Sequence, residues 1–454
     1  MSVWRVRDFR VFFTATSFSQ LGVNAGYVAA PTLAVTALDA TTAQVGLLAT
    51  LSTVAFLLIG LPSGAWVDRL NARRVLVAAD LIRAVLIGSV PVAWWLGGLT
   101  LAQLYAVVLI NGCATVFFDV GSQSVLPRLV GRENLIPANA AVVTLISGAT
   151  VAGRGAGGAL VQLLTAPIAL AYAAAAHLAS AIRLATFHIR PSAEPSTSGG
   201  SLRSQVAEGL RHVLGDRTLR ALAATAALSN LGSQLINTVL PIVVVRDLGL
   251  PAGALGGFWA VGGVGLLIGA RLARPIAARL GDGPTLAYAG LILAPAALAV
   301  PLLDRGPAGG WSVVGWLLAM GKIGLDNVLG VSIRQRRTPD RLLGRMNATF
   351  RFLLTGALAI GAALAGLVGQ LAGVRATMWA GGVLLAIAFV PVFVSPLRRA
   401  TADGDTRLSF ARGQSDGSVE CLGGPAGATG LRSELAARGV VAGASVRRAR
   451  THDQ

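Results

Sequence analysis

Four ionisable side chains stand within long apolar stretches of the sequence. Asp80 and Arg83 lie three residues apart in ADLIRA, and Lys322 and Asp326 lie four apart in GKIGLD. Residues at these spacings share one face of a helix, so each acid can pair with its own base. Lys322 is the only lysine of the chain, and a buried lysine can lose its proton whereas arginine keeps it. The second pair is therefore either a structural ion pair or a site that exchanges protons or meets the charge of a substrate.

The composition indicates which solvent surrounds these charges. The chain has 454 residues, of which 54% are hydrophobic and 13% are charged, whereas a soluble domain carries about a quarter charged residues. Apolar runs of about 18 or more residues, the length needed to cross about 30 Å of hydrocarbon, recur along most of the chain. Such segments must be helices, because hydrocarbon offers no partner to free backbone groups. The sequence thus predicts an all-α, multi-pass membrane protein.

The charge of the loops predicts the topology. The formal net charge is +18, which alone could indicate a nucleic-acid ligand. However, one set of alternate loops holds only Arg246, Arg305 and Arg375, against about twenty arginines in the other set, and cytoplasmic loops retain positive charge. We therefore expect a protein of the bacterial inner (plasma) membrane with both termini in the cytoplasm. Its expected partners include the lipid bilayer and exclude nucleic acid.

Hydropathy predicts twelve transmembrane spans. Those of the first half lie near 11–36, 45–66, 75–97, 101–122, 138–164 and 167–188. Those of the second half lie near 220–245, 253–274, 285–303, 311–333, 346–371 and 376–396. The predicted domains are a six-helix bundle at 1–189, a cytoplasmic linker with an amphipathic helix at 190–219, a second six-helix bundle at 220–396, and a disordered cytoplasmic tail at 397–454.

The two halves repeat one another in sequence. The fourth and tenth spans each end with an aspartate, a proline loop, a Gly-Arg pair and an Asn-Ala pair in the same order. The matching residues are Asp119 with Asp326, Pro127 with Pro339, Gly131 with Gly344, and Asn139 with Asn347. Parallel six-span repeats are a transporter architecture in which the substrate site lies between the halves near mid-membrane.

Polar side chains at equivalent places of the first and seventh spans are candidates for that site. They are Gln20, Asn24, Gln234 and Asn237. They either line the cavity or join neighbouring helices by hydrogen bonds.

Arg154 is a further charge inside a span. It lies in GATVAGRGAGGAL, in the outer half of the fifth span. A charged side chain at the bilayer centre costs about 2.5–3.5 kcal/mol, so it needs a partner or a use. Arg154 can either attract an anionic substrate or extend outward to the membrane surface, and the sequence leaves both open. For Asp80 and Arg83, which lie one to two turns from the cytoplasm, the simpler interpretation is a local ion pair.

A charged motif between the second and third spans resembles that of a known family. GAWVDRLNARRVL, residues 64–76, resembles the loop pattern G-x-x-x-D-R-x-G-R-R of the major facilitator superfamily. The matching residues are Gly64, Asp68, Arg69 and Arg73. Asn71 replaces the second glycine, and asparagine is the next most tolerant residue for a left-handed turn. ADLIRA, FFDVGSQSVLPRLV, EGLRHVLGDRTLRAL and PDRLLGRMNA further resemble the branch that holds enterobactin exporters and macrolide-efflux proteins.

The resemblance implies a function and a set of site residues. It implies a transporter of two pseudo-symmetric six-helix bundles that exports a drug-, macrolide- or siderophore-like small molecule by alternating access, against proton entry. It also implies a cytoplasmic gate in which Asp68 caps the helix that starts near Asn347, while Arg69 or Arg73 pairs with Asp119. The alternative is that these arginines only anchor the topology. We expect a monomer without a cofactor or a bound metal.

The sequence argues against an enzyme. The chain has four histidines and two cysteines, with no HExxH, no GxSxG and no cluster at metal-ligand spacing. Its single lysine is followed by Ile323, so a P-loop for ATP is missing as well. A transport-inactive scaffold or receptor with the same fold remains the alternative function.

The gate hypothesis predicts the effect of one substitution. Asp68→Asn keeps the size of the side chain but removes a charge that stabilises a helix N-terminus by about 0.3–2 kcal/mol, depending on burial. We expect slower export by this variant at an unchanged amount of protein in the membrane, measured as efflux rate alongside an immunoblot of the membrane fraction. Normal efflux by a correctly inserted variant would rule out the gate role.

Overall fold

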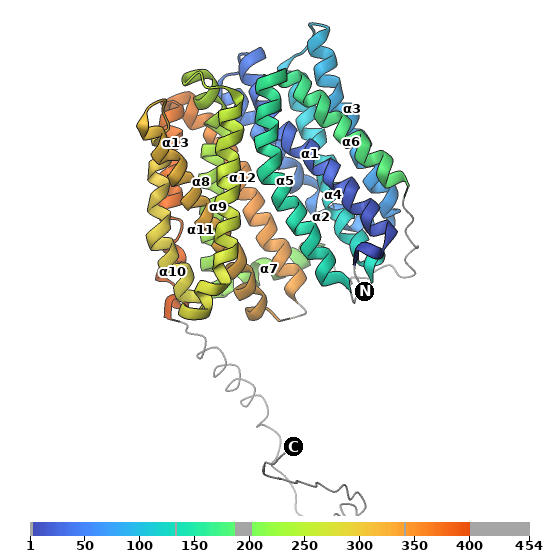
Figure 1. The fold of residues 1–454 in the computed structure, drawn as a ribbon. Helices are drawn as coiled ribbons and strands as arrows, with labels where there is room; N and C mark the ends of the chain where they lie inside the picture. The colour runs from blue at the N-terminus through green and yellow to red at the C-terminus, as the bar shows by residue number, and fades with distance from the viewer. Residues whose placement is uncertain (1–2, 132–133, 187–201, 340–341, 400–454) are drawn as a thin grey trace, which may run out of the picture. The chain divides into compact units, whose positions relative to one another are not determined.

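The structure is a computed structural model that describes residues 3–131, 134–186, 202–339 and 342–399. Within these ranges some side chains, including those of Asp68 and Arg69, lie outside the description. Contacts between Cα atoms divide the chain into residues 1–402 and 403–454, and the account below concerns the first unit. Its described residues form helices joined by short connections, with no strand among them (Figure 1).

The helices follow the predicted spans closely. The first half contains α1 (Arg7–Ala37), α2 (Thr42–Arg69), α3 (Ala72–Trp95), α4 (Leu101–Val130), α5 (Leu135–Leu164) and α6 (Ala166–Ala185). The second half contains α8 (Arg217–Pro241), α9 (Ala252–Leu280), α10 (Asp282–Leu293), α11 (Pro307–Arg337), α12 (Leu343–Ala372), α13 (Val374–Ile387) and α14 (Val390–Val394), with α7 (Leu202–Gly215) before them. Shorter elements are η1 (Val3–Arg5), η3 (Ile242–Asp247), η4 (Ala294–Leu302) and η6 (Pro396–Arg399). The π-helical η3 continues α8, and η4 continues α10.

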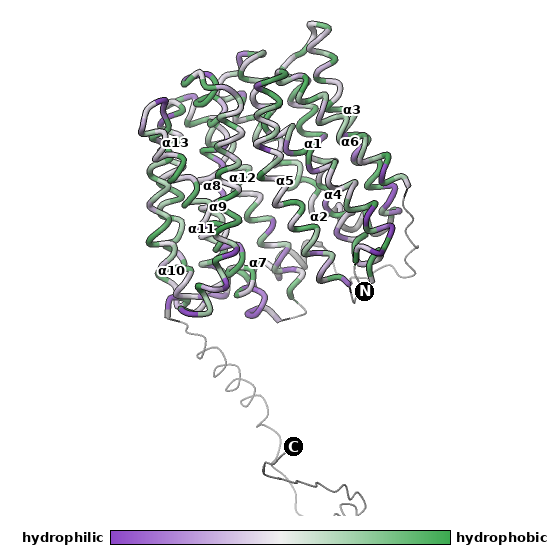
Figure 2. Tube along the Cα trace, viewed as in Figure 1, coloured by the Kyte–Doolittle hydropathy of each residue, from purple (hydrophilic) through white to green (hydrophobic). Residues whose placement is uncertain are grey.

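Hydropathy along these helices fits a membrane interior. Eleven helical segments of the described chain are long and apolar enough to cross a membrane. The first predicted span, near 11–36, is α1, a helix of 31 residues, and it is the one predicted span that is not among those eleven. Its middle part carries Ser17, Ser19, Gln20 and Asn24. Hydrophobic residues run along most of the helices, and hydrophilic residues concentrate toward the end where the N-terminus lies (Figure 2).

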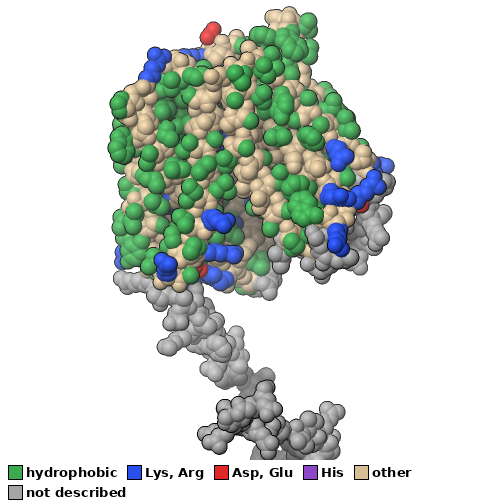
Figure 3. Space-filling view, viewed as in Figure 1, with side chains coloured by type: hydrophobic (Ala, Val, Ile, Leu, Met, Phe, Trp, Pro, Cys, Tyr) green, Lys and Arg blue, Asp and Glu red, His purple; other side chains and the backbone are tan. Residues whose placement is uncertain are grey.

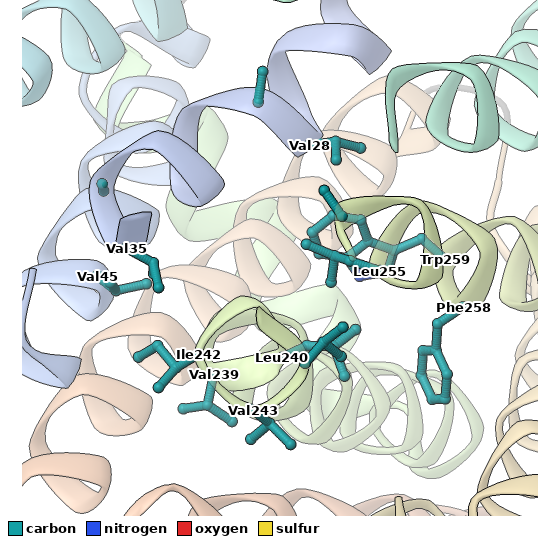
Figure 4. Close-up of a cluster of buried hydrophobic side chains, with 14 of the residues drawn as sticks. Val28, Val35, Val45, Val239, Leu240, Ile242, Val243, Leu255, Phe258 and Trp259 are labelled. Carbon is teal, nitrogen blue, oxygen red and sulfur yellow. The ribbon is translucent and has the colours of Figure 1, made fainter. Parts of the chain in front are cut away.

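The helices form two bundles. In the first, α6 packs against α1 and α3, and α4 packs against α2 and α3; in the second, α11 packs against α9, and α8 packs against α12 and α13. The bundles lie side by side in Figure 1. Each has a buried apolar cluster of its own, and a third cluster draws residues from both. Figure 4 shows part of this shared cluster, in which Val28, Val35 and Val45 of the first bundle face Val239, Ile242 and Leu255 of the second. The predicted fold class is confirmed.

The bundles meet most closely through glycines, in the contacts of α2 with α12 and of α5 with α9. A Cβ built on Gly366 would lie 3.0 Å from the Cα atom of Gly46, and one on Gly158 would lie 2.8 Å from the Cα atom of Gly256. Two helix backbones can come this close to each other only where both residues at the contact lack a side chain. All four glycines lie near the helix ends on the arginine-poor side of the molecule. The structure is therefore closed on that side.

The amphipathic helix predicted in the linker is α7, which packs against α12 and α8. Glu208 of α7 pairs with Arg345 of α12, and Val213 is buried in the apolar cluster of the second bundle. Leu210 and Leu214 remain exposed. This helix is thus attached to the second bundle, while the boundaries predicted for the linker and the tail remain predictions.

Two local expectations were wrong. Asn71 has a φ of −69°, so it forms no left-handed turn. Its side-chain oxygen instead accepts hydrogen bonds from the backbone N–H groups of Arg73 (3.1 Å) and Arg74 (3.4 Å), which makes it the N-cap of α3. The proline loop expected at Pro127 is also absent, because α4 continues through this residue to Val130.

The glycine contacts predict a conformational effect of Gly158→Val. The added side chain overlaps α9 in the closed arrangement, and such overpacking costs about 1–3 kcal/mol. We expect the population to shift toward a form open on the arginine-poor side. The measurement is the distance between spin labels at the exposed residues Ala37 and Asp247, in a background without other cysteines.

The neighbouring Gly257 supplies the matched control. A Cβ at this position meets nothing within 4 Å, so Gly257→Val should leave the label distances as they are in the parent chain. Equal behaviour of the two valine variants would contradict the packing argument.

Candidate functional site

A cavity of about 220 Å³ lies between the two bundles. Tyr27, Asn111 and His177 line it from the first bundle, and Asn237 and Trp259 line it from the second. The rings of Tyr27 and Trp259 meet edge to face with centroids 4.9 Å apart, so one aromatic pair spans both halves. The indole nitrogen of Trp259 donates a hydrogen bond of 2.8 Å to the Asn237 side-chain oxygen. This central cavity has the position predicted for a substrate site, at the interface of the repeats.

Only half of the predicted cavity-lining residues reach the central cavity. Gln234 and Asn237 line it, whereas Gln20 and Asn24 do not. The buried Asn24 donates from its side-chain amide to the backbone oxygen of Gln20 at 2.8 Å. Its own Cβ lies 2.8 Å from where a Cβ on Gly153 would stand. Asn24 therefore packs α1 against α5, but its hydrogen bond stays within α1 and does not join two helices.

Arg154 does not extend to the membrane surface. Its guanidinium carbon lies 4.1 Å from the centroid of the Tyr27 ring, a cation–π contact. Its Nε atom is buried and has no hydrogen-bond partner. Because Tyr27 lines the central cavity, Arg154 places a positive charge directly behind one wall of that cavity.

A buried polar network lies inside the first bundle. One oxygen of Asp80 accepts hydrogen bonds from Arg83 (2.8 Å) and Ser19 (3.1 Å), and it lies 3.2 Å from Nδ1 of His177. Arg83 also donates to Ser19 at 3.0 Å, and its guanidinium stacks on Phe118. The side chains of Asp80, Arg83 and His177 are at most 1% exposed. The predicted Asp80–Arg83 pair exists, but Arg83 is fully enclosed and does not extend to the cytoplasm.

His177 and Ser19 were missed by sequence reasoning. His177 lies on α6 and is separated from Asp80 by 97 residues, so no local spacing links them. The only available signal was a histidine within an apolar span. In the structure this imidazole contacts a carboxylate on one side and borders the central cavity on the other. Histidine is the side chain whose ordinary charge change falls nearest neutral pH, so this arrangement can exchange a proton with the cavity.

The other oxygen of Asp80 and the hydroxyl of Ser180 are buried as well, and the two side chains interact with each other. The carboxyl group of Asp119, on α4, interacts electrostatically with Arg83 and with Arg351 of α12. Within the described ranges, no group of three or more His, Cys, Asp or Glu side chains could hold a metal ion.

Lys322 and Asp326 form the predicted ion pair on α11, with Nζ 2.5 Å from a carboxylate oxygen. Their side chains are 3% and 17% exposed. Both line a second cavity of about 340 Å³, together with Thr225, Ser229 and Arg334. Asn237 lines this cavity as well as the central one, so the two meet at its side chain.

The predicted cytoplasmic gate is only partly described. Gly64, Asp68 and Arg69 lie in the last turns of α2, and their side chains are outside the described part of the structure. Arg73 donates to the backbone oxygen of Ala185, and no pairing of Arg73 with Asp119 is seen. The Arg73–Asp119 contact of the gate hypothesis is thus not present in this structure, which is closed on the arginine-poor side.

Arginines of the arginine-poor loops satisfy backbone oxygens at the closed side. Arg246 donates to the backbone oxygens of Ala40 (2.9 Å) and Val35 (3.0 Å), and so connects the second bundle to the first. Arg375 donates to Pro301 at 2.8 Å, and Arg305 donates to Leu248. These roles were missed, because the sequence gives no indication of which carbonyl groups a loop arginine will meet.

Two six-helix halves around one cavity, closed on one side, are the architecture of a membrane transporter. The chain belongs to the Major Facilitator Superfamily, whose family model matches residues 12–331. This confirms the family that the GAWVDRLNARRVL motif predicted, and a family of transporters fits the prediction that the chain is not an enzyme.

Two relatives and one solved structure illustrate the match. The chain is 29% identical over 297 residues to the uncharacterized MFS-type transporter y4rN of Sinorhizobium fredii, covering 65% of this chain and 72% of the relative. It is 26% identical over 178 residues to the multidrug efflux pump Tap of Mycolicibacterium fortuitum, covering 38% of this chain and 44% of Tap, less than half of that protein's length. The nucleoside transporter NupG has a TM-score of 0.70 at 13% identity over 85% of this chain and 99% of NupG, which shows the fold alone.

The buried network predicts a stability effect of Asp80→Asn. This variant leaves the Arg83 charge buried without its carboxylate, and breaking one side of a buried pair costs about 3–5 kcal/mol. We expect a clearly lower unfolding temperature of the detergent-purified protein. The double variant Asp80→Asn/Arg83→Met should recover most of the loss, because no charge then stays unpaired.

Asp282→Asn serves as the control for this prediction. It breaks the pair with Arg336, whose side chain is 58% exposed, and exposed pairs contribute only about 0–1 kcal/mol. If Asp80→Asn and Asp282→Asn unfold at the same temperature, the buried network does not stabilise the first bundle as described.

Proposed function

We propose that the protein is a secondary active exporter of the bacterial inner (plasma) membrane. It moves an amphipathic small molecule outward by alternating access and couples this step to proton entry. The observation that carries the proposal is the central cavity between two bundles that meet closely on the arginine-poor side. A molecule bound there can be released to the other side when the closure changes sides.

The direction in which this form opens follows from the topology. The closed side carries the arginine-poor loops, with the Arg246 contacts and the glycine contacts. Arginine-poor loops face away from the cytoplasm. The described form is therefore the one that loads from the cytoplasm, with both termini on that side. Asp68, Arg69, Arg73 and Asp119 would come together when the cytoplasmic side closes.

Export, as opposed to import, is supported by relatives. Tap of M. fortuitum is described as a multidrug efflux pump, although the match spans less than half of its length. The composition of the central cavity fits an amphipathic substrate, since rings and aliphatic side chains alternate with the amides of Asn111, Gln234 and Asn237.

Two pairs can carry the coupling proton. The first is His177 with Asp80, which borders the central cavity. The second is Lys322 with Asp326, which borders the second cavity. Histidine and lysine can both release a proton when their surroundings change, whereas arginine cannot.

The proposal predicts proton-driven accumulation in inside-out vesicles. Vesicles that contain the protein should take up at least one of three amphipathic probes (ethidium, erythromycin or dansylglycine) when a proton gradient, acidic inside, is imposed. A protonophore should abolish the uptake, since the gradient is its energy source. Vesicles from cells without the protein are the control.

Failure of all three probes with correctly inserted protein would count against export. Uptake that persists after the protonophore would keep transport but remove proton coupling from the proposal.

A further inference from the structure

The second cavity differs from the central cavity in its charge. Among the described residues, those that line the central cavity include no Asp, Glu, Lys or Arg. The second cavity is lined by Lys322, Asp326 and Arg334. Because Lys322 and Asp326 neutralise each other, the lining keeps one positive charge in excess, that of Arg334.

The second cavity also holds hydrogen-bond donors without a partner. The hydroxyl groups of Thr225 and Ser229 are buried and make no hydrogen bond, and both residues are only 5% exposed. The Nε atom of Arg334 is likewise buried without a partner, while its guanidinium stacks on the ring of Phe350. Buried polar groups are nearly always hydrogen-bonded in proteins, so a cavity that leaves three of them unpaired is suited to a bound ligand.

The two unpaired hydroxyl groups belong to a row of polar side chains on α8. Thr225, Ser229, Ser233 and Asn237 follow one another at intervals of four residues, so they share one face of α8. The row covers about 18 Å along the helix, at about 1.5 Å per residue. It begins beside Arg334 in the second cavity and ends at Asn237, where the central cavity begins. A molecule of this length could occupy both cavities at once.

We propose that the second cavity binds the anionic head group of an amphipathic substrate, such as a carboxylate, whose apolar body lies in the central cavity against the rings of Tyr27 and Trp259. Lys322, Arg334 and the two hydroxyl groups donate to the head group. The Arg154 charge behind Tyr27 favours the same sign of ligand. Basic side chains also gather around the lower end of the face shown in Figure 3. That the bound anion is a transported substrate rests on the proposed function, whereas the existence of the anion-binding site does not.

The test compares three probes with one fluorescent group and different head charges. Dansylglycine is an anion, dansylamide is neutral and dansylcadaverine is a cation at neutral pH. The full chain is placed in nanodiscs of phosphatidylcholine, a lipid without net charge, and the rise of dansyl fluorescence is titrated against empty nanodiscs. We expect saturable binding of dansylglycine, about tenfold or more tighter than binding of the other two probes.

Two variants break the same ion pair with opposite changes of charge. Lys322→Met removes a positive donor, so it should weaken dansylglycine binding by about ten- to a hundredfold. Asp326→Asn removes the negative charge, so it should leave this binding as tight as before or tighter. A merely structural ion pair predicts the same loss for both variants.

Further variants test the donors without disturbing the pair. Ser229→Ala removes an unpartnered hydroxyl and should weaken dansylglycine binding by about three- to tenfold, with dansylamide binding unchanged. Arg334→Met should act like Lys322→Met. The matched control is Arg271→Met, which removes the same charge from an exposed position of α9 outside the lining of both cavities, and should change nothing.

Several results would overturn the proposal. The proposal fails if dansylglycine shows no saturable binding or if dansylcadaverine binds more tightly than dansylglycine. It also fails if Lys322→Met and Asp326→Asn weaken dansylglycine binding equally. Equilibrium binding needs no proton gradient and no direction of transport. If dansylglycine binds as expected but no probe is exported by vesicles, the proposed export fails and the anion site stands. If erythromycin or ethidium is exported without any preference for the anion in binding, the anion site fails and export stands.

Discussion

The contact of glycine backbones between the two bundles is the constraint on which the described arrangement depends. Gly46 with Gly366 and Gly158 with Gly256 bring α2 to α12 and α5 to α9 on the arginine-poor side. Because these pairs leave no room for side chains, the bundles are held together at one end. Arg246 reinforces the same end by reaching the backbone oxygens of the α1–α2 connection. The central cavity lies between the same two bundles that these contacts hold together at one end.

Charges inside the bundles are arranged in two different ways. In the first bundle, Asp80, Arg83 and His177 are sealed from solvent, and only the imidazole borders the central cavity. In the second bundle, Lys322 and Asp326 open onto a cavity of their own with unpaired hydroxyl groups nearby. The repeated sequence motif thus places Asp119 and Asp326 in different surroundings. The two halves share a fold, but the buried charges form an enclosed network in the first half and line a cavity in the second.

Much of the fold could be predicted from the sequence, because membrane solvent leaves few alternatives. The lengths of the apolar runs predict where the helices lie, and the arginine counts of the loops predict on which side of the membrane each loop lies. Pairs at intervals of three and four residues, Asp80 with Arg83 and Lys322 with Asp326, were also predictable, since helix geometry alone brings them together. Contacts between distant segments were not. His177 reaches Asp80 across 97 residues, and Asn24 turned toward α5 although its counterpart Asn237 lines the cavity. The rotation of a helix about its axis decides such cases, and tertiary packing sets that rotation.

The hydrogen bond between Trp259 and Asn237 has a consequence for whatever passes between the two cavities. An indole N–H can only donate, so the group 2.8 Å away must be the amide oxygen of Asn237. That bond fixes which branch of the amide is the oxygen and which is the NH₂ group, although the oxygen keeps a second lone pair. Within the described part of the chain, the one side chain that lines both cavities has its amide held by an indole and is therefore fixed in orientation. A solute at Asn237 thus meets an amide whose donor and acceptor ends cannot exchange places unless the bond to Trp259 breaks.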